Sequence, residues 1–100
     1  MSEKRKPFSR EHLRRLRNDI PVRIVIEQLR WPNKSREGRF CFLCPQCNEF
    51  LTATNPSTNL GRCFHCETNF NTIDLVMATQ ECDFVAAVQY LEATFLRLPH

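Results

Sequence analysis

The sequence of 100 residues predicts a small α+β protein: a β-ribbon of three to four short antiparallel strands, flanked by an N-terminal helix and two C-terminal helices. Three observations support this fold class. Two Cys-x-x-Cys pairs stand fifteen residues apart, β-favouring runs lie beside and between them, and amphipathic helical patterns lie on both sides. With 42% hydrophobic and 25% charged residues the chain is typical of a folded protein, and its length suits one domain.

The chain begins with a basic segment, residues 1–8, which we expect to be a flexible tail; residues 9–100 are expected to form the single domain. Ser9 is a suitable N-cap for a short helix over residues 10–17, which carries two leucines on one side. Pro21, whose missing N–H costs nothing in the first turn of a helix, is expected to open a second helix. Its apolar stripe consists of Val22, Val25, Ile26 and Leu29.

Three strand-like runs follow a polar turn at residues 33–38. These runs are residues 39–43, 50–54 and 60–64, and they are rich in Phe, Leu, Thr and Cys. The last two runs flank an Asn-Pro-Ser turn at residues 55–59, which predicts a β-hairpin.

Two helices are expected after the strands. The first begins at Asn71 or Thr72, with Asp74 in its first turn, where a negative side chain suits the helix dipole. Asp83 is expected to cap the second helix. The apolar residues of that helix are Phe84, Val88, Leu91 and Phe95.

Four of the six cysteines predict a metal site, namely Cys44, Cys47, Cys63 and Cys66. Their spacing is typical of zinc ribbons, because each tight turn directs two sulfurs at one ion and the fifteen residues between the pairs supply two strands. Four thiolates complete a tetrahedron, so we expect one structural Zn²⁺ with no position open for catalysis. The sequence has no membrane-spanning stretch or secretory signal, so we expect a cytoplasmic protein without a membrane partner, in which cysteines stay reduced.

Neighbouring residues offer alternative ligands. Cys41 could pair with Cys44, but a proline suits the turn between two ligands, which favours Cys44 with Cys47. His65 lies between two ligands and could replace a cysteine, although a position that faces solvent or nucleic acid is favoured. Cys41 and Cys82 are expected to be packing residues.

Positive charge is concentrated in the N-terminal part of the chain. Residues 1–39 hold twelve basic and five acidic residues, a net charge of +7, whereas residues 40–100 hold two basic and six acidic residues, a net charge of −4. Such a basic region could contact the phosphates of nucleic acid or could form a solvated surface. The candidate nucleic-acid contacts are Arg14, Arg15, Arg17, Arg39, Arg62 and His65.

Aromatic residues on the strands could stack on bases; they are Phe40, Phe42, Phe50 and Phe64. A chain of this length has few residues with which to fill a core, so about three of these four are expected inside it.

Residues 44–95 resemble the zinc-binding domain of bacterial and phage DNA primases, a Cys-His-Cys-Cys zinc-ribbon family. The motifs that carry the resemblance are Cys44-Pro45-Gln46-Cys47, Arg62-Cys63-Phe64-His65-Cys66, Asn71-Thr72-Ile73-Asp74-Leu75-Val76-Met77 and Asp83-Phe84-Val85-Ala86-Ala87-Val88. The helix at residues 21–30 is similar to the helix before the ribbon in that family. Cys47 stands where primases usually have histidine, and Glu67 and Phe70 stand where glycines are usual.

The resemblance implies a DNA-binding zinc ribbon that prefers single strands and recognises the template during replication or priming in a bacterial, phage or mobile-element system. Its partners would be single-stranded DNA and a primase, a helicase or another replication or mobile-element protein. The chain is not expected to be an enzyme by itself, because the resemblance covers the recognition module and not the polymerising domain. The alternative is a protein–protein adaptor that docks a polymerase, transposase or helicase.

Overall fold

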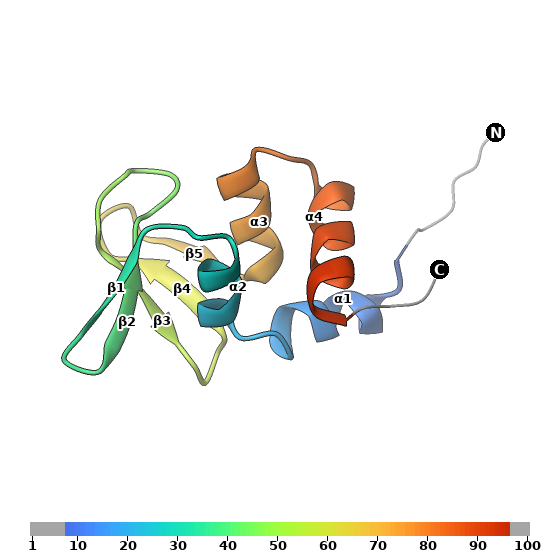
Figure 1. Cartoon of the computed structure of the whole chain (residues 1–100), viewed down its shortest axis with the longest axis horizontal. Coiled ribbons are helices and arrows are strands. Elements are labelled where there is room, and N and C mark those ends of the chain that lie inside the picture. Colours follow the sequence, from blue (N-terminus) through green and yellow to red (C-terminus); the bar gives the residue numbers. More distant parts are fainter. Residues whose placement is uncertain (1–7, 97–100) are drawn as a thin grey trace.

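The computed structural model describes residues 8–96 and has the α+β fold that the sequence predicts (Figure 1). The sheet forms one end of the molecule, α1 and α4 lie at the other end, and α2 and α3 lie between them. The elements are α1 (Arg10–Asn18), α2 (Val22–Gln28), β1 (Asn33–Arg36), β2 (Arg39–Phe42), β3 (Thr52–Asn55), β4 (Leu60–Cys63), β5 (Thr68–Phe70), α3 (Thr72–Gln80), α4 (Phe84–Leu91) and the π-helix η1 (Glu92–Leu96). Apart from Phe8, the predicted tail lies outside the described residues.

The five strands form one antiparallel sheet in the order β1-β2-β3-β4-β5, so every strand pairs with its neighbour along the chain. Residues 33–36 form β1, although the sequence predicts a polar turn there. All four residues of β1 are exposed, so this strand has no apolar alternation that would predict it. Glu37 and Gly38, with φ angles of 53° and 78°, make the tight turn to β2. β5 (Thr68–Phe70) was not among the expected runs either, so the sheet has five strands instead of three to four.

Both N-terminal helices begin close to their predicted positions. Ser9 caps α1, since its hydroxyl oxygen accepts a hydrogen bond from the backbone N–H of His12 at 3.0 Å. Pro21 is the N-cap of α2 and has no side-chain acceptor to offer. Asn59 in the β3–β4 turn supplies the acceptor instead, because its Oδ1 accepts from the backbone N–H of Val22 at 3.0 Å.

Asn59 ties the two helices to the sheet. Its Nδ2 donates to the carbonyl oxygens of Arg17 at 2.6 Å and Ile20 at 2.8 Å, while its Oδ1 serves α2. One side chain thus satisfies backbone groups at the end of α1 and at the start of α2. Asn59 has a left-handed φ of 56°, a conformation that Asn adopts more readily than most residues.

Local side-chain caps fix the starts of α3 and α4. Asn71 Oδ1 accepts from the backbone N–H of Asp74 at 2.8 Å, and the Asp74 carboxylate accepts from the backbone N–H of Asn71 at 3.1 Å. Asp83 caps α4 by accepting from the backbone N–H of Ala86 at 2.8 Å. These contacts confirm the predicted helix starts. None of the helices in residues 8–96 has both the length and the apolar composition needed to cross a membrane.

Two clusters of buried side chains form the core. The helical cluster joins the four α-helices and consists of Leu16, Ile20, Val25, Ile73, Val76, Ala87, Val88 and Leu91. The sheet cluster lies between the sheet and helices α2 and α3, and consists of Val22, Ile26, Phe40, Phe42, Cys44, Cys63, Phe70 and Leu75. Because α2 and α3 contribute to both clusters, they join the two halves of the molecule.

Within the sheet cluster, the ring of Phe42 packs directly on Gly61 of β4. A Cβ atom at position 61 would lie 2.7 Å from Cζ of Phe42, well inside van der Waals contact. The absence of a side chain at this position therefore makes room for the most deeply buried phenylalanine of the sheet.

Candidate functional site

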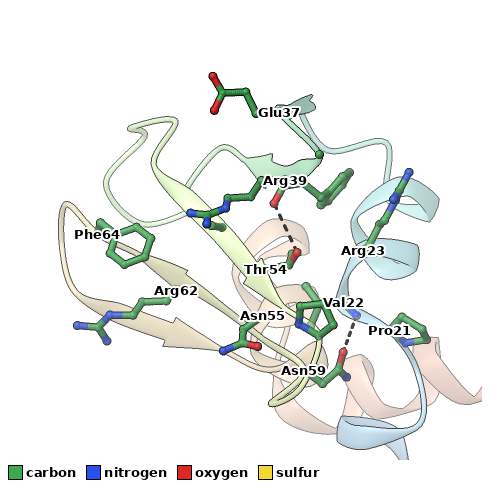
Figure 2. A pocket seen from close by; sticks show the side chains of 14 residues that line it. Pro21, Val22, Arg23, Glu37, Arg39, Thr54, Asn55, Asn59, Arg62 and Phe64 are labelled. Carbon is green, nitrogen blue, oxygen red and sulfur yellow. Dashed lines mark hydrogen bonds between the residues drawn. The ribbon is translucent and has the colours of Figure 1, made fainter.

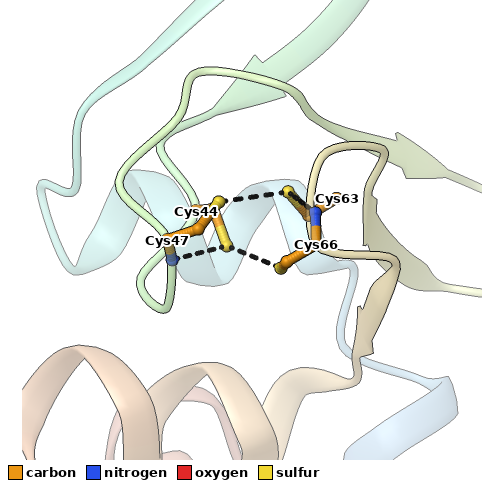
Figure 3. Close-up of side chains that lie close together, drawn as sticks. All are labelled: Cys44, Cys47, Cys63 and Cys66. Atoms are coloured by element: carbon orange, nitrogen blue, oxygen red, sulfur yellow. Dashed lines mark hydrogen bonds between the residues drawn. The ribbon is translucent and has the colours of Figure 1, made fainter.

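The two Cys-x-x-Cys pairs lie at the same end of the sheet (Figure 3). The first pair follows β2, and the second begins at Cys63, the last residue of β4. Thr52, at the start of β3, pairs with Phe42 on one side and with Cys63 on the other, so this row of the sheet brings the two loops together. The residues between the pairs form the β3–β4 hairpin, as the spacing predicts.

The sulfur atoms of Cys44, Cys47, Cys63 and Cys66 form one cluster, in which all four lie within 4.8 Å of one another. The Sγ atoms of Cys44 and Cys66 are 3.7 Å apart, and those of Cys47 and Cys63 are 3.6 Å apart. A disulfide would bring two sulfurs to about 2.05 Å. Thiolates bound to Zn²⁺ at about 2.3 Å stand about 3.8 Å apart at the corners of a tetrahedron. The cluster could therefore hold a metal ion, and its spacing and donor atoms fit Zn²⁺.

Backbone N–H groups of the two loops point at the sulfurs. The N–H groups of Gln46 and Cys47 each donate to Sγ of Cys44 at 3.4 Å, and the N–H of Cys66 donates to Sγ of Cys63 at 3.5 Å. Such donors stabilise a thiolate more than a thiol. The backbone of each loop is therefore preorganised to stabilise a cysteine thiolate.

The residue after each cysteine pair adopts a left-handed backbone, with a φ angle of 63° at Asn48 and 57° at Glu67. The two loops thus share one local form, which turns the chain away after the second sulfur. Glycine adopts this conformation without strain, whereas a glutamate carries a Cβ that crowds the backbone. Glu67 therefore leaves the loop intact but strained.

The neighbouring thiols differ in acidity. Burial raises the pKa of Cys47 to about 12, and the thiols of Cys63, Cys44 and Cys66 contribute to the rise. Burial also acts to raise the pKa of Cys63, but hydrogen bonds from the backbone N–H groups of Cys66 and His65 outweigh it and lower that pKa to about 6. The Cys63 thiolate therefore forms readily. It opposes ionisation of the Cys47 thiol, whose sulfur lies 3.6 Å away. A divalent cation among the sulfurs would remove this opposition.

The alternative ligands lie outside the sulfur cluster. Among the described residues, the group that could hold a metal consists of the four predicted cysteines and includes neither Cys41 nor His65. Cys41 is half-buried in β2, and His65 is exposed in the second cysteine loop. Cys82, just before α4, packs against the helical cluster, as expected for a packing residue.

A groove of about 930 Å³ lies where the start of α2 meets the β1–β2 turn and the β3–β4 hairpin (Figure 2). Three arginines line it, namely Arg23, Arg39 and Arg62. Glu37 is the one acidic residue among the lining side chains, so the formal charge around the groove is +2. The groove is larger than a second basic hollow, of about 320 Å³, on α1.

The structure brings together two of the predicted nucleic-acid contacts, since Arg39 and Arg62 both line the groove and point away from α2 (Figure 2). Arg23, which lines the same groove from α2, was not among the predicted contacts. Its Nε donates to the Glu27 carboxylate at 3.2 Å, and its guanidinium lies 5.1 Å from the ring centre of Phe40. Arg23 and Glu27 stand four residues apart on α2, a spacing typical of an ordinary surface ion pair. The sequence near Arg23 therefore does not indicate that its side chain lines the groove.

Fewer of the four strand phenylalanines are buried than expected. Phe40 and Phe42 belong to the sheet cluster, whereas Phe50 is half-buried, with the Lys34 ammonium 4.6 Å from its ring centre. Phe64 is 60% exposed at the edge of the groove. Its exposure follows from its place in a Cys-x-x-Cys turn, because the two sulfurs point inward and the residues between them point outward.

The predicted arginines of α1 separate into two groups. Arg14 and Arg17 line a hollow of about 320 Å³ together with Arg10, which was not among the predicted contacts. Arg15 does not line it, since successive residues of a helix are rotated by about 100°. Arg15 therefore lies on neither basic surface.

Comparison with known proteins found no protein-family model and no curated protein that matches this chain. The function is therefore inferred from the site and from the resemblance described above.

Proposed function

We propose that this protein is a zinc-ribbon module that binds single-stranded DNA, as its resemblance to the zinc-binding domain of DNA primases implies. The four clustered thiolates hold one structural Zn²⁺, and the DNA strand lies in the groove. The observation that carries the proposal is the groove itself, where three arginines and an exposed phenylalanine surround about 930 Å³. By the same resemblance, the module recognises template during replication or priming, beside a primase, a helicase or another replication or mobile-element protein.

The groove offers the two kinds of contact that a single strand needs. The guanidinium groups of Arg23, Arg39 and Arg62 contact phosphates, and the exposed ring of Phe64 accepts a stacked base. Base stacking on an aromatic side chain contributes about 1–3 kcal/mol per base. A single strand suits this surface better than a duplex, because a base must be unpaired before it can stack on a protein ring.

The metal site positions this surface and does not contact the DNA. Phe64 lies between the ligands Cys63 and Cys66, and Arg62 directly precedes the first of them. Order in the second cysteine loop therefore sets the direction of Phe64 and supports the end of β4, which carries Arg62. Removal of the metal would weaken DNA binding even though the charges of the arginines stay the same.

Salt-dependent binding to a labelled oligothymidylate tests the DNA interface. In fluorescence anisotropy, R39A/R62A is expected to bind about tenfold more weakly and to lower the slope of log affinity against log salt by about 1.4, since each phosphate contact contributes about 0.7. R15A removes a charge outside the groove and is expected to change affinity by less than about twofold. Absence of wild-type binding at low salt, or equal binding by R39A/R62A, would overturn the proposal.

Native mass spectrometry of the full chain tests the metal. We expect one Zn²⁺ per chain in the wild-type protein and a lower zinc occupancy in Cys66→Ser, because three thiolates with a water or a serine oxygen bind the ion more weakly than four thiolates do. Cys41→Ser is the matched control, since this cysteine also lies in the sheet half but outside the sulfur cluster, and it should retain the ion. A wild-type protein without metal, or a Cys66→Ser variant that holds zinc against a competing chelator as well as the wild type does, would contradict the assignment.

The adaptor alternative uses a different surface. Phe84 and Val85, in the first turn of α4, are 40% and 41% exposed, and the ring of Phe84 lies 6.3 Å from that of Phe8. If docking of a polymerase, helicase or transposase were the main function, F84S/V85S would abolish it while R39A/R62A left it unchanged. The DNA-binding proposal predicts that F84S/V85S retains wild-type affinity for the oligothymidylate.

A further inference from the structure

A second basic surface lies on α1, and we call it the arginine stripe: Arg10, Arg14 and Arg17. Residues at spacings of four and three share one side of a helix, and this stripe extends for about 10 Å along the axis. The three arginines surround the hollow of about 320 Å³, whose other lining residues are Glu11 and Leu13. The formal charge around the hollow is therefore +2.

The fold does not neutralise the stripe. The ion pairs within residues 8–96 join His12 to Glu92 and Arg23 to Glu27, and none of them includes a stripe arginine. Like charges three or four residues apart on a helix repel and weaken it, whereas the Arg23–Glu27 pair on α2 places opposite charges at the same spacing. An anion over the stripe would relieve a repulsion that the unbound protein retains.

The stripe meets the groove at Asn59. This residue lines the groove, and its Nδ2 donates to the carbonyl oxygen of Arg17, the last residue of the stripe, at 2.6 Å. Figure 2 shows Asn59 near Pro21 and Val22 at one end of the groove, with Phe64 at the other. A strand that leaves the groove at the Asn59 end therefore passes close to the end of α1.

We propose that the arginine stripe binds the phosphodiester backbone of the DNA strand held in the groove and so extends the footprint beyond Asn59. This inference rests on the proposed function, because it assumes a strand in the groove. A phosphate backbone fits the stripe better than an acidic protein segment does, because Leu13 is the one apolar residue beside it and is itself half-buried. A docked protein helix would need a larger apolar surface.

Oligonucleotides of two lengths separate the stripe from the groove. Small single-strand-binding folds usually cover about 4–16 nucleotides, so an oligothymidylate of about 6 nucleotides occupies part of that range and one of about 20 exceeds it. For the full-length protein, we expect R10Q/R14Q/R17Q to bind the long oligonucleotide about tenfold more weakly, with a salt slope lower by about 2, and to bind the short one as the wild type does. R15Q, on the same helix but outside the stripe, is expected to match the wild type at both lengths.

The outcomes distinguish this inference from the proposed function. If the wild type binds the short oligonucleotide and the triple variant keeps full affinity for the long one, the proposal of DNA in the groove is retained and the stripe proposal is overturned, because the stripe is then a solvated charged surface. Equal losses in R15Q and in the triple variant also overturn it, because they indicate general charge attraction. Failure of the wild type to bind either length overturns both proposals. Circular dichroism of each variant confirms that α1 remains folded.

Discussion

The helical cluster and the sheet cluster are built from different side chains. The helical cluster is entirely aliphatic, whereas the sheet cluster includes Cys44 and Cys63 and has Cys47 and Cys66 packed against it. Aliphatic side chains stabilise a fold through burial alone, but thiols arranged as metal ligands contribute most of their stabilisation when an ion binds. One half of the fold is therefore held by packing, and the other depends on the ion proposed for its cysteines.

Helices α2 and α3 connect these two halves. In α2, Val25 belongs to the helical cluster while Val22 and Ile26 belong to the sheet cluster, and α3 is divided in the same way. Loss of order in the sheet would therefore leave one side of each helix without its partner. The helical half should persist without metal, but with reduced stability.

The largest effect is expected from Cys44→Ser. A structural Zn²⁺ contributes an apparent binding free energy of about 10–16 kcal/mol, which matches or exceeds the total stability of about 5–15 kcal/mol of an ordinary domain. We expect hydrogen exchange to show loss of protection in β3 and β4, while amides of α3 and α4 keep measurable protection. Cys41→Ser is the control and should change stability by no more than about 0.5 kcal/mol. Equal loss of protection in both halves would remove the distinction between them.

Leu16→Ala tests the helical half alone. Leu16 is fully buried in the helical cluster, so its truncation should lower the free energy of unfolding by about 2–5 kcal/mol in chemical denaturation. One zinc per chain should still be found by native mass spectrometry, because Leu16 belongs to the helical cluster and the four cysteines lie in or against the sheet cluster. Leu51→Ala, at a site 48% exposed, should cost far less. Loss of zinc from Leu16→Ala would show that the metal site cannot form without the helical cluster.

Gly61→Ala tests how much the sheet half also depends on packing. The added methyl group would meet the Phe42 ring at 2.7 Å, and such overpacking costs about 1–3 kcal/mol in denaturation experiments. Phe42→Leu in the same chain shortens the opposing side chain and should recover part of that loss. If Gly61→Ala is neutral at full zinc occupancy, the ion alone determines the stability of the sheet.

The smallest effect, a gain, is expected from Glu67→Gly. Glycine removes the strain of the left-handed conformation in the second cysteine loop but adds freedom to the unfolded chain, for a net gain of about 0.5–1 kcal/mol. Glu81→Gly makes the same change in the helical half, at the left-handed C-cap of α3, and should gain a similar amount. Urea denaturation with saturating zinc measures both. A loss at Glu67 alone would indicate that its side chain has a role that the backbone strain does not explain.

Local signals in the sequence were sufficient to predict where helices α1, α3 and α4 begin and which four cysteines form the cluster. Ser9, Asn71 and Asp83 cap their helices through hydrogen bonds to residues three positions away, so a short window of sequence contains the whole interaction. The cysteine pairs were likewise predictable, because the two strands between them fix the distance from one turn to the other.

Features that depend on distant partners could not be predicted. Asn59 bonds to Arg17, which lies 42 residues away in the sequence, and nothing near Asn59 indicates that contact. Arg23 reaches the groove because α2 packs beside the hairpins, and its local sequence shows the ion pair with Glu27 instead. The strand at residues 33–36 was missed because none of its side chains is buried, so pairing with β2 is its main support.

The order of strands in the sheet determines how the metal site assembles. Every strand pairs with its neighbour along the chain, so two successive antiparallel pairings, β2–β3 and β3–β4, bring the second cysteine pair to the first. Closing a short loop costs little chain entropy, and hairpins form in about 1–10 μs. The unliganded chain can therefore present its four thiols repeatedly on a microsecond timescale. Ion capture is then limited by encounter with the ion, and no slow search through distant pairings precedes it.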